Sequence, residues 1–253
     1  GKLTVCYGQW NRGVQPKLTW PDRYEIPAET LKTYGYDSME HFRNWRWYQK
    51  YSAGPIADLG SHQIDIFSWF LETDPTAVVA MGGSDYFADR EWYEDVLCTY
   101  AYKTKDGSAR AFYQVLNTNS YGHYFERFGG DGGSITISEN PKKCYYVAEP
   151  GKELPAYMAG VETVMHDGHQ AVPLLKAMES MGDEGKAAAE RFMNKNVHQM
   201  HLENFFTAVN KGDARLLNCS AEEAYKTAVA VLQVIPAVDA GGGVTFKPGD
   251  FKA

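Results

Sequence analysis

Short apolar runs that alternate with turn-forming residues dominate the middle of the chain and predict strands. They fall at residues 2–10, 77–82, 95–103, 109–117, 121–128, 134–138 and 144–147. Consecutive strands joined by short turns favour antiparallel pairing, so these runs predict one large, mostly antiparallel sheet. The glycine-rich turn at residues 129–133 leads into a strand, and it therefore lacks the helix N-terminus that a dinucleotide phosphate requires.

Helical periodicity occurs on both sides of this strand-rich region. Residues 38–51 suit a short helix with Ser38 as its N-cap, and residues 55–71 suit a longer apolar helix that follows Gly54-Pro55. Two further helices are expected near the C-terminus, and we interpret their apolar stripes as core. The stripes are Leu202, Phe205, Phe206 and Val209 in the first helix, and Tyr225, Ala228, Val229, Leu232 and Ile235 in the second.

These elements predict an α+β fold in which a large, open, mostly antiparallel sheet carries helices on one face. Residues 11–37 are expected to be irregular, and residues 149–195 form a long excursion with a modest helix near 184–194. A broad open sheet face that is rich in aromatic residues should be covered by another subunit, so we expect a homo-oligomer.

The helix at 55–71 carries the candidate chemistry. Asp58, His62 and Asp65 are spaced i, i+4 and i+7, which places them on one face of an uninterrupted helix. A carboxylate four residues before a histidine can hold the imidazole for general acid–base catalysis, or the two can bind a metal. The same spacing also suits a core histidine with surface aspartates. Gly60 indicates close packing at this helix.

Other polar residues carry weaker signals. Asn44, Arg46 and Lys50 precede this helix and suit either hydrogen bonding to substrate hydroxyls or a carboxylate, or a solvated surface. His166 and His169 form an H-x-x-H pair, which in a loop is more typical of plain loop residues than of a metal site.

Composition narrows the class of partner. The chain has 253 residues and a formal net charge of −7, which argues against nucleic acid. The sequence contains no apolar run long enough to span a membrane. Four scattered cysteines predict free, buried thiols. The chain begins on Gly1 without an initiator Met, so we expect a piece of a longer protein. Its compartment is open: the default expectation is cytoplasmic, and an exported form is compatible with a chain that lacks the N-terminus of its parent.

The order of motifs around the candidate helix resembles a known family. Trp45-Arg46, Gly54-Pro55, Asp58, His62, Asp65 and Trp69 follow one another as in the segment that opens the C-terminal domain of the glucose–fructose oxidoreductase / inositol dehydrogenase (Gfo/Idh/MocA) family. Runs in the predicted sheet and the closing helix pair extend the resemblance to the end of the chain, least well over residues 149–195. Residues 1–253 would then be one such C-terminal domain without its N-terminal dinucleotide-binding domain.

The resemblance implies an NAD(P)-dependent oxidoreductase, bacterial and active in carbohydrate metabolism, that acts on a sugar, polyol or related hydroxyl compound. His62 would be the general base, and Asp58 would orient it or bind the substrate hydroxyl. Asn44, Arg46, Lys50 and Asp65 are the expected substrate-binding residues. The family's Glu-Lys-Pro motif and the G-x-G-x-x-G fingerprint are absent from this sequence. NAD or NADP is therefore expected to bind the full-length parent, while this chain alone should bind neither a cofactor nor a metal and should be inactive.

Two alternatives remain open at this point. One is a metal-dependent hydrolase or lyase that uses Asp58 and His62. The other is a non-catalytic sugar-binding module. In all of these cases the open sheet face would join the subunits.

Overall fold

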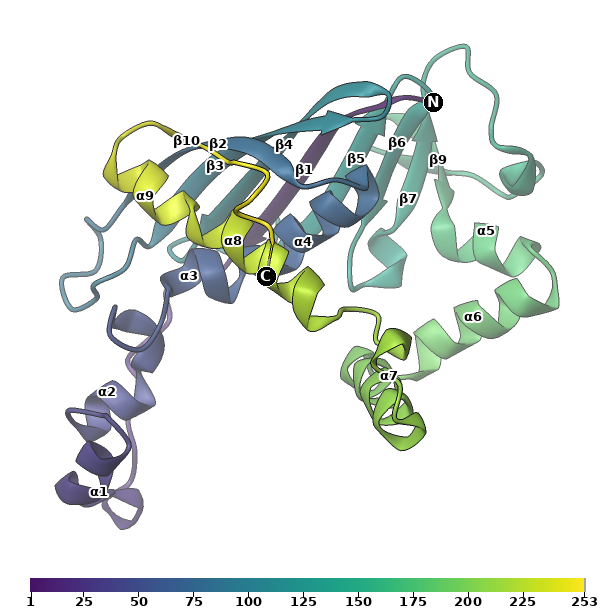
Figure 1. Cartoon of the computed structure of the whole chain (residues 1–253). Coiled ribbons are helices and arrows are strands. Elements are labelled where there is room, and N and C mark those ends of the chain that lie inside the picture. Colours follow the sequence, from purple (N-terminus) through teal and green to yellow (C-terminus); the bar gives the residue numbers. More distant parts are fainter. Residues whose placement is uncertain (253) are drawn as a thin grey trace.

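A computed structural model describes residues 1–252 and shows a large sheet with helices on one side (Figure 1). The predicted α+β class is confirmed. Along β3, alternate side chains at Val96, Cys98 and Tyr100 are buried, which is the period that the sequence pattern predicts. The strands are β1 (Leu3–Asn11), β2 (Pro75–Gly83), β3 (Asp95–Thr104), β4 (Gly107–Leu116), β5 (Tyr124–Gly130), β6 (Gly133–Ile137), β7 (Tyr145–Ala148), β8 (Val164–His166), β9 (His169–Pro173) and β10 (Gly243–Thr245).

The strand order is β10-β2-β3-β4-β1-β5-β6-β7-β9-β8. The first strand lies in the middle of the sheet, where β1 runs parallel to β4 and antiparallel to β5. The backbone N–H of Arg12 donates to the carbonyl of Leu116 (2.7 Å), so the chain leaves β1 beside the end of β4. This insertion brings Trp10 and Arg12 to the candidate helix, which is far from them in sequence.

Helices α3 (Gly54–Asp58), α4 (Gly60–Leu71), α8 (Ala221–Leu232) and α9 (Val234–Asp239) cover one face of the sheet (Figure 1). From α4, Phe67 is fully buried against β1, where a Cβ on Gly8 would lie only 2.8 Å from the Phe67 ring. The hydroxyl of Tyr100 donates to the carbonyl of Ala230 (3.0 Å), which fixes α8 on the sheet. Close backbone approach at Gly8 therefore sets the position of α4 over the strands.

The interpretation of the two C-terminal stripes as core is wrong for the first helix and partly wrong for the second. In α7 (Val197–Lys211), the side chains of Leu202, Phe205, Phe206 and Val209 are each about half exposed. In α8 the fully buried residues are Ala230 and Val231, whereas Tyr225 and Leu232 are exposed. A helical period identifies an apolar face but does not say which other element covers it.

The remaining helices lie outside this layer. They are α1 (Ala28–Thr33), α2 (Met39–Arg43), α5 (Leu174–Ser180) and α6 (Asp183–Asn194), with 3-10 turns at Asp22–Tyr24, Trp45–Trp47, Pro141–Lys143, Ala156–Met158 and Ala214–Leu216. The helix predicted at 38–51 is shorter, because it ends at Arg43 and Asn44 leaves the helical conformation. Ser38 does cap it, by accepting from the backbone N–H of His41 (3.2 Å). Within the excursion, the hairpin β8–β9 and α5 accompany the expected helix.

The other face of the sheet exposes apolar side chains. Tyr7 stacks on Phe112 and Phe125, with ring centroids 5.3 and 5.5 Å apart, and lies only partly exposed. The exposed residues of the strands include Val5, Val79, Met81 and Leu97.

None of the helices in residues 1–252 is long and apolar enough to cross a membrane. The cysteines are free, and those at positions 6, 98 and 144 are buried as predicted, but Cys219 is exposed.

Candidate functional site

The candidate helix is interrupted at the residue between Asp58 and the segment that carries His62. Helix α3 ends at Asp58, Leu59 adopts φ −112° and ψ −43°, and α4 begins at Gly60. A Cβ on Gly60 would lie 3.0 Å from both Ile56 Cδ1 and Tyr113 Cε1, so the predicted close packing is present. The expectation of one continuous helix over 55–71 is therefore wrong, and its regular spacing does not fix how Asp58 and His62 face each other.

Asp58 is held by arginines. The Arg46 Nε–H donates to both carboxylate oxygens of Asp58, at 3.1 and 3.2 Å, and Arg12 Nη1 lies 3.9 Å from Asp58 Oδ2. The Arg46 guanidinium also lies over the Trp45 ring at 4.3 Å, which restricts its orientation. Within residues 1–252, no hydrogen bond or ion pair joins Asp58 to His62, so the predicted orientation of His62 by Asp58 is not present.

His62 lies in the first turn of α4 and packs against the end of β1. Its ring centroid is 5.3 Å from that of Trp10, at an interplanar angle of 35°, and Trp10 stacks in turn on Tyr124 at 4.6 Å. His62 remains exposed, so its ring is accessible to a ligand and to solvent protons. An accessible imidazole against an aromatic wall is suited to acid–base chemistry on a bound hydroxyl.

One cavity of about 250 Å³ brings most of the candidate residues together. Asn44, Arg46, Asp58 and His62 line it, with four residues that the sequence analysis did not single out: Trp10, Arg12, Arg43 and Trp47. These four are separated in sequence from the α3–α4 motif, and only the strand order and the turn at 44–47 place them beside it. The only feature of the sequence that could have pointed to Arg12 is its position directly after the end of a strand.

Two of the predicted substrate-binding residues lie elsewhere. The Lys50 ammonium pairs with Asp37 Oδ1 (2.7 Å), and Lys50 is absent from the cavity lining. Asp65 accepts a hydrogen bond from the Thr227 hydroxyl and so links α4 to α8. Both residues have local structural partners, which is sufficient to explain their side-chain positions.

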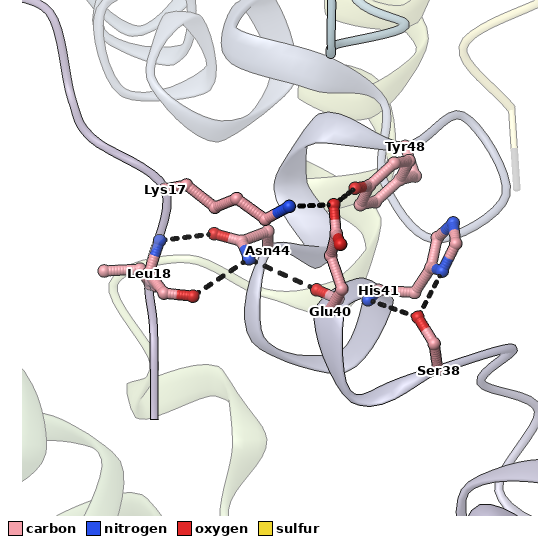
Figure 2. Close-up of polar contacts among 7 residues, drawn as sticks. All are labelled: Lys17, Leu18, Ser38, Glu40, His41, Asn44 and Tyr48. Atoms are coloured by element: carbon pink, nitrogen blue, oxygen red, sulfur yellow. Dashed lines mark hydrogen bonds and ion pairs between the residues drawn. The ribbon is translucent and has the colours of Figure 1, made fainter. Parts of the chain in front are cut away.

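Asn44 lines the cavity, but its side-chain amide forms hydrogen bonds within the protein (Figure 2). Its Oδ1 accepts from the backbone N–H of Leu18 (2.8 Å), and its Nδ2 donates to the carbonyls of Leu18 (3.2 Å) and Glu40 (3.3 Å). The Asn44 side chain is almost fully buried, with 3% of the residue exposed. Asn44 therefore fixes the segment 15–18, which forms one wall of the cavity, and does not offer its amide to a ligand.

Two cationic residues reinforce this wall. Lys17 pairs with Glu40, whose carboxylate also accepts from the Tyr48 hydroxyl (2.9 Å), as Figure 2 shows. The bond from Lys17, followed by that from Tyr48, lowers the pKa of Glu40 below its ordinary value. Arg90 donates from Nη2 to the carbonyl of Gln15, and burial lowers the pKa of this arginine. The wall at 15–18 is thus tied to the protein at three residues, Gln15, Lys17 and Leu18.

A buried carboxyl lies beneath the other side of His62. Glu126 on β5 is 6% exposed, and its Oε1 accepts from Gln63 Nε2 (2.9 Å). Burial raises the pKa of Glu126, an effect that the bond from Gln63 only partly offsets. Glu126 and His62 both line a further cavity of about 560 Å³ between α4, α8 and the sheet. The sequence analysis missed Glu126, because a single Glu in an alternating strand carries no signal of burial.

The two histidines of the excursion at residues 149–195 lie opposite each other in a β-hairpin. His166 and His169 are register partners in β8 and β9, and His166 stacks on Tyr145 with centroids 4.4 Å apart. In the part of the chain that the structure describes, no three His, Cys, Asp or Glu side chains form a group that could hold a metal ion.

Comparisons with known proteins point in one direction. Residues 30–135 match the family model of the GFO/IDH/MocA C-terminal domain. Over 99 residues the chain is 25% identical to "Putative oxidoreductase YteT" of Bacillus subtilis (strain 168), an alignment that covers 36% of this chain and 23% of that protein.

Solved structures match over nearly the whole chain. Levoglucosan dehydrogenase in complex with NADH gives a TM-score of 0.59 at 14% identity, over 98% of this chain and 59% of that one. An oxidoreductase from Agrobacterium radiobacter, in complex with NAD⁺, L-tartaric acid and magnesium, gives 0.51 at 13% identity, over 97% and 57%. At these identities the likeness shows the fold alone. The chain spans about three-fifths of the length of the first of these proteins.

Proposed function

We propose that this chain is the substrate-binding and oligomerisation domain of an NAD(P)-dependent oxidoreductase of the Gfo/Idh/MocA family, acting on a sugar, polyol or related hydroxyl compound. The observation that carries the proposal is the cavity in which His62 and Asp58 meet three arginines and two tryptophans. Tryptophan faces suit the apolar faces of a sugar ring, and the charged groups suit its hydroxyls. The match of residues 30–135 to the family model, and a fold similar to that of a dehydrogenase, support an oxidoreductase as well.

In the proposed reaction, residues of this chain remove the hydroxyl proton and position the substrate. A substrate hydroxyl in the cavity donates to the accessible ring nitrogen of His62, which removes the proton as general base. Asp58, already engaged by Arg46, accepts a hydrogen bond from a neighbouring hydroxyl and positions the substrate. Trp10 limits the rotation of the imidazole by packing on it.

The glycine-rich turn of this chain does not fit the phosphates of a dinucleotide. The glycine-rich turn at 130–133 joins β5 to β6, so no helix begins there to receive the phosphates. We therefore propose that a separate domain of the complete protein holds NAD or NADP, and that residues 1–253 fold as one domain beside it. The nicotinamide would supply the hydride acceptor.

The exposed apolar face of the sheet supports the oligomer proposal. Val79 and Met81 on β2 and Leu97 on β3 expose between 37% and 76% of their surface. Adjacent exposed apolar side chains of this size on an open sheet face favour a partner of the same shape, such as a second copy of the chain. A monomer in light scattering at micromolar concentration would contradict this proposal.

The test uses the product of the complete gene. Bound nicotinamide is sought by absorbance and by mass spectrometry after denaturation, and oxidation of a panel of sugars and polyols is followed at the nicotinamide absorbance. His62→Ala is expected to lower kcat/KM by about 10²- to 10⁴-fold, because it removes the general base. His166→Ala on the distant hairpin is the matched control. Undiminished activity of His62→Ala, or the absence of nicotinamide binding, would refute the proposal.

A further inference from the structure

The cavity that contains His62 is cationic, although the protein is acidic. Arg12, Arg43 and Arg46 line it, and the only carboxylate in its lining is that of Asp58. Three guanidinium groups against one carboxylate leave an excess of two positive charges when His62 is neutral. The whole chain carries a formal net charge of −7, so this local excess is opposite in sign to the protein's average.

Asp58 offsets only part of the charge of the arginines. Its two oxygens are occupied by the Arg46 Nε–H at 3.1 and 3.2 Å, which leaves the terminal nitrogens of Arg46 for another acceptor. Arg12 reaches Asp58 only at 3.9 Å, beyond hydrogen-bond distance, and its side chain is 33% exposed. The N–H donors of the Arg12 guanidinium are therefore not taken up by Asp58 and remain for a ligand.

The arginines are held in place for such a ligand. The guanidinium of Arg46 lies 4.3 Å from the Trp45 ring and that of Arg12 lies 5.4 Å from the Trp10 ring. Stacking on an aromatic ring restricts a guanidinium to one plane, and a fixed guanidinium fork matches the two oxygens of a carboxylate. A neutral sugar would leave these charges without a counter-charge in a partly enclosed site.

We infer that the ligand of this cavity is a hydroxy acid, a sugar derivative that carries a carboxylate, and that Arg12 and Arg46 bind this group while His62 faces a hydroxyl. The inference rests on the proposed function only in taking the cavity as the substrate site. A carboxylate is the smaller of the two anions that a guanidinium fork matches, so it fits a cavity of this size better than a phosphate. The volume of about 250 Å³ is close to the lower end of small-ligand pockets, about 300 Å³.

The test is calorimetric binding to this chain with ligands that differ only at one carbon. D-glucuronate is compared with D-glucose and D-glucose 6-phosphate, and D-galacturonate with D-galactose. At least one acid is expected to bind roughly tenfold or more tightly than its neutral partner, since hydrogen bonds to charged groups are the strong ones. Arg12→Gln should remove this preference, because it lowers the affinity for the acid more than the affinity for its neutral partner.

Arg23→Gln is the control for a lost positive charge, because Arg23 is exposed and lies outside the cavity lining. Equal binding of acids and neutral sugars, tighter binding of the phosphate, or no binding of any acid at millimolar concentration would overturn the inference. Retention of the preference in Arg12→Gln would do the same. Because the assay requires no hydride transfer, an acid that binds but is not oxidised would count against the proposed activity and leave the ligand class standing.

Discussion

Replacing Asn44 by Ala tests whether this residue fixes the cavity wall or serves as a ligand for substrate. The substitution removes three hydrogen bonds, two to the backbone of Leu18 and one to the carbonyl of Glu40. It leaves the fold of α2 itself intact, because the Glu40 carbonyl still accepts from the backbone N–H of residue 44 (2.9 Å). The perturbation is thus confined to the connection between α2 and the segment 15–18.

The expected magnitude follows from these contacts. A hydrogen bond of this kind contributes about 0.5–1.5 kcal/mol net, so three give about 3 kcal/mol if all are lost without replacement. Leu18 is 49% exposed, and water can therefore replace Asn44 at its peptide groups. We expect the free energy of unfolding to fall by about 2 kcal/mol, with faster opening of the segment 15–18.

The assay combines urea unfolding, followed by circular dichroism, with hydrogen exchange of the peptide that contains residues 15–18. Asn210→Ala is the matched control, since Asn210 is exposed on α7. A change in unfolding free energy below about 0.5 kcal/mol, with unaltered exchange at 15–18, would show that the Asn44 amide is not required by the wall. That result would favour the sequence-based interpretation of Asn44 as a substrate ligand.

Three further perturbations address the packing, the buried carboxyl and the open face. Gly8→Ala should destabilise by about 1–3 kcal/mol in urea unfolding, because its Cβ would lie 2.8 Å from Phe67 Cζ. Gly13→Ala, which meets nothing closer than 3.9 Å, should be nearly neutral, and similar values for both would refute this packing. Because the pKa of Glu126 is raised, its contribution to stability is complete below its unfolded-state pKa and is lost as pH rises through its folded-state pKa. Glu126→Gln also gives the unpartnered Oε1 of Gln63 a donor, so it should add about 1 kcal/mol to the unfolding free energy near neutral pH and flatten that pH dependence, and an unchanged pH profile would contradict it. Met81→Glu, at a side chain 76% exposed on the sheet face, should shift light scattering toward monomer with an unchanged circular dichroism spectrum, and an unaltered oligomer would argue against this interface.

Much of the fold was predictable because local patterns specify it. Alternating apolar positions and the turn residues between them predicted the strands from β2 to β7 to within a few residues, and with them the α+β class. The capping residue Ser38 marked the start of α2, and its hydroxyl accepts from the backbone N–H of His41 as expected. These features depend on neighbours in sequence, so the sequence contains the information directly.

The motif from Asp58 to His62 was also visible in the sequence, but its geometry was not. The interruption at Leu59 depends on packing of Gly60 against Ile56 and Tyr113, and Tyr113 lies on a distant strand. The partners of Asp58 are Arg46 and Arg12, which its own helix cannot reveal. Spacing fixes a face only while the helix continues.

The sequence by itself determined the strands β1 to β7, the N-cap of α2 and the identity of the polar residues at the candidate site. Only the tertiary structure decided which of them meet. Strand β1 lies between β4 and β5, which places Trp10 and Arg12 in the same cavity as His62. Lys50 and Asp65 instead contact Asp37 and Thr227. It also decided that the apolar stripe of α7 remains exposed. Local propensity is a property of neighbouring residues, whereas the charge and shape of a cavity arise from contacts between segments that the strand order brings together.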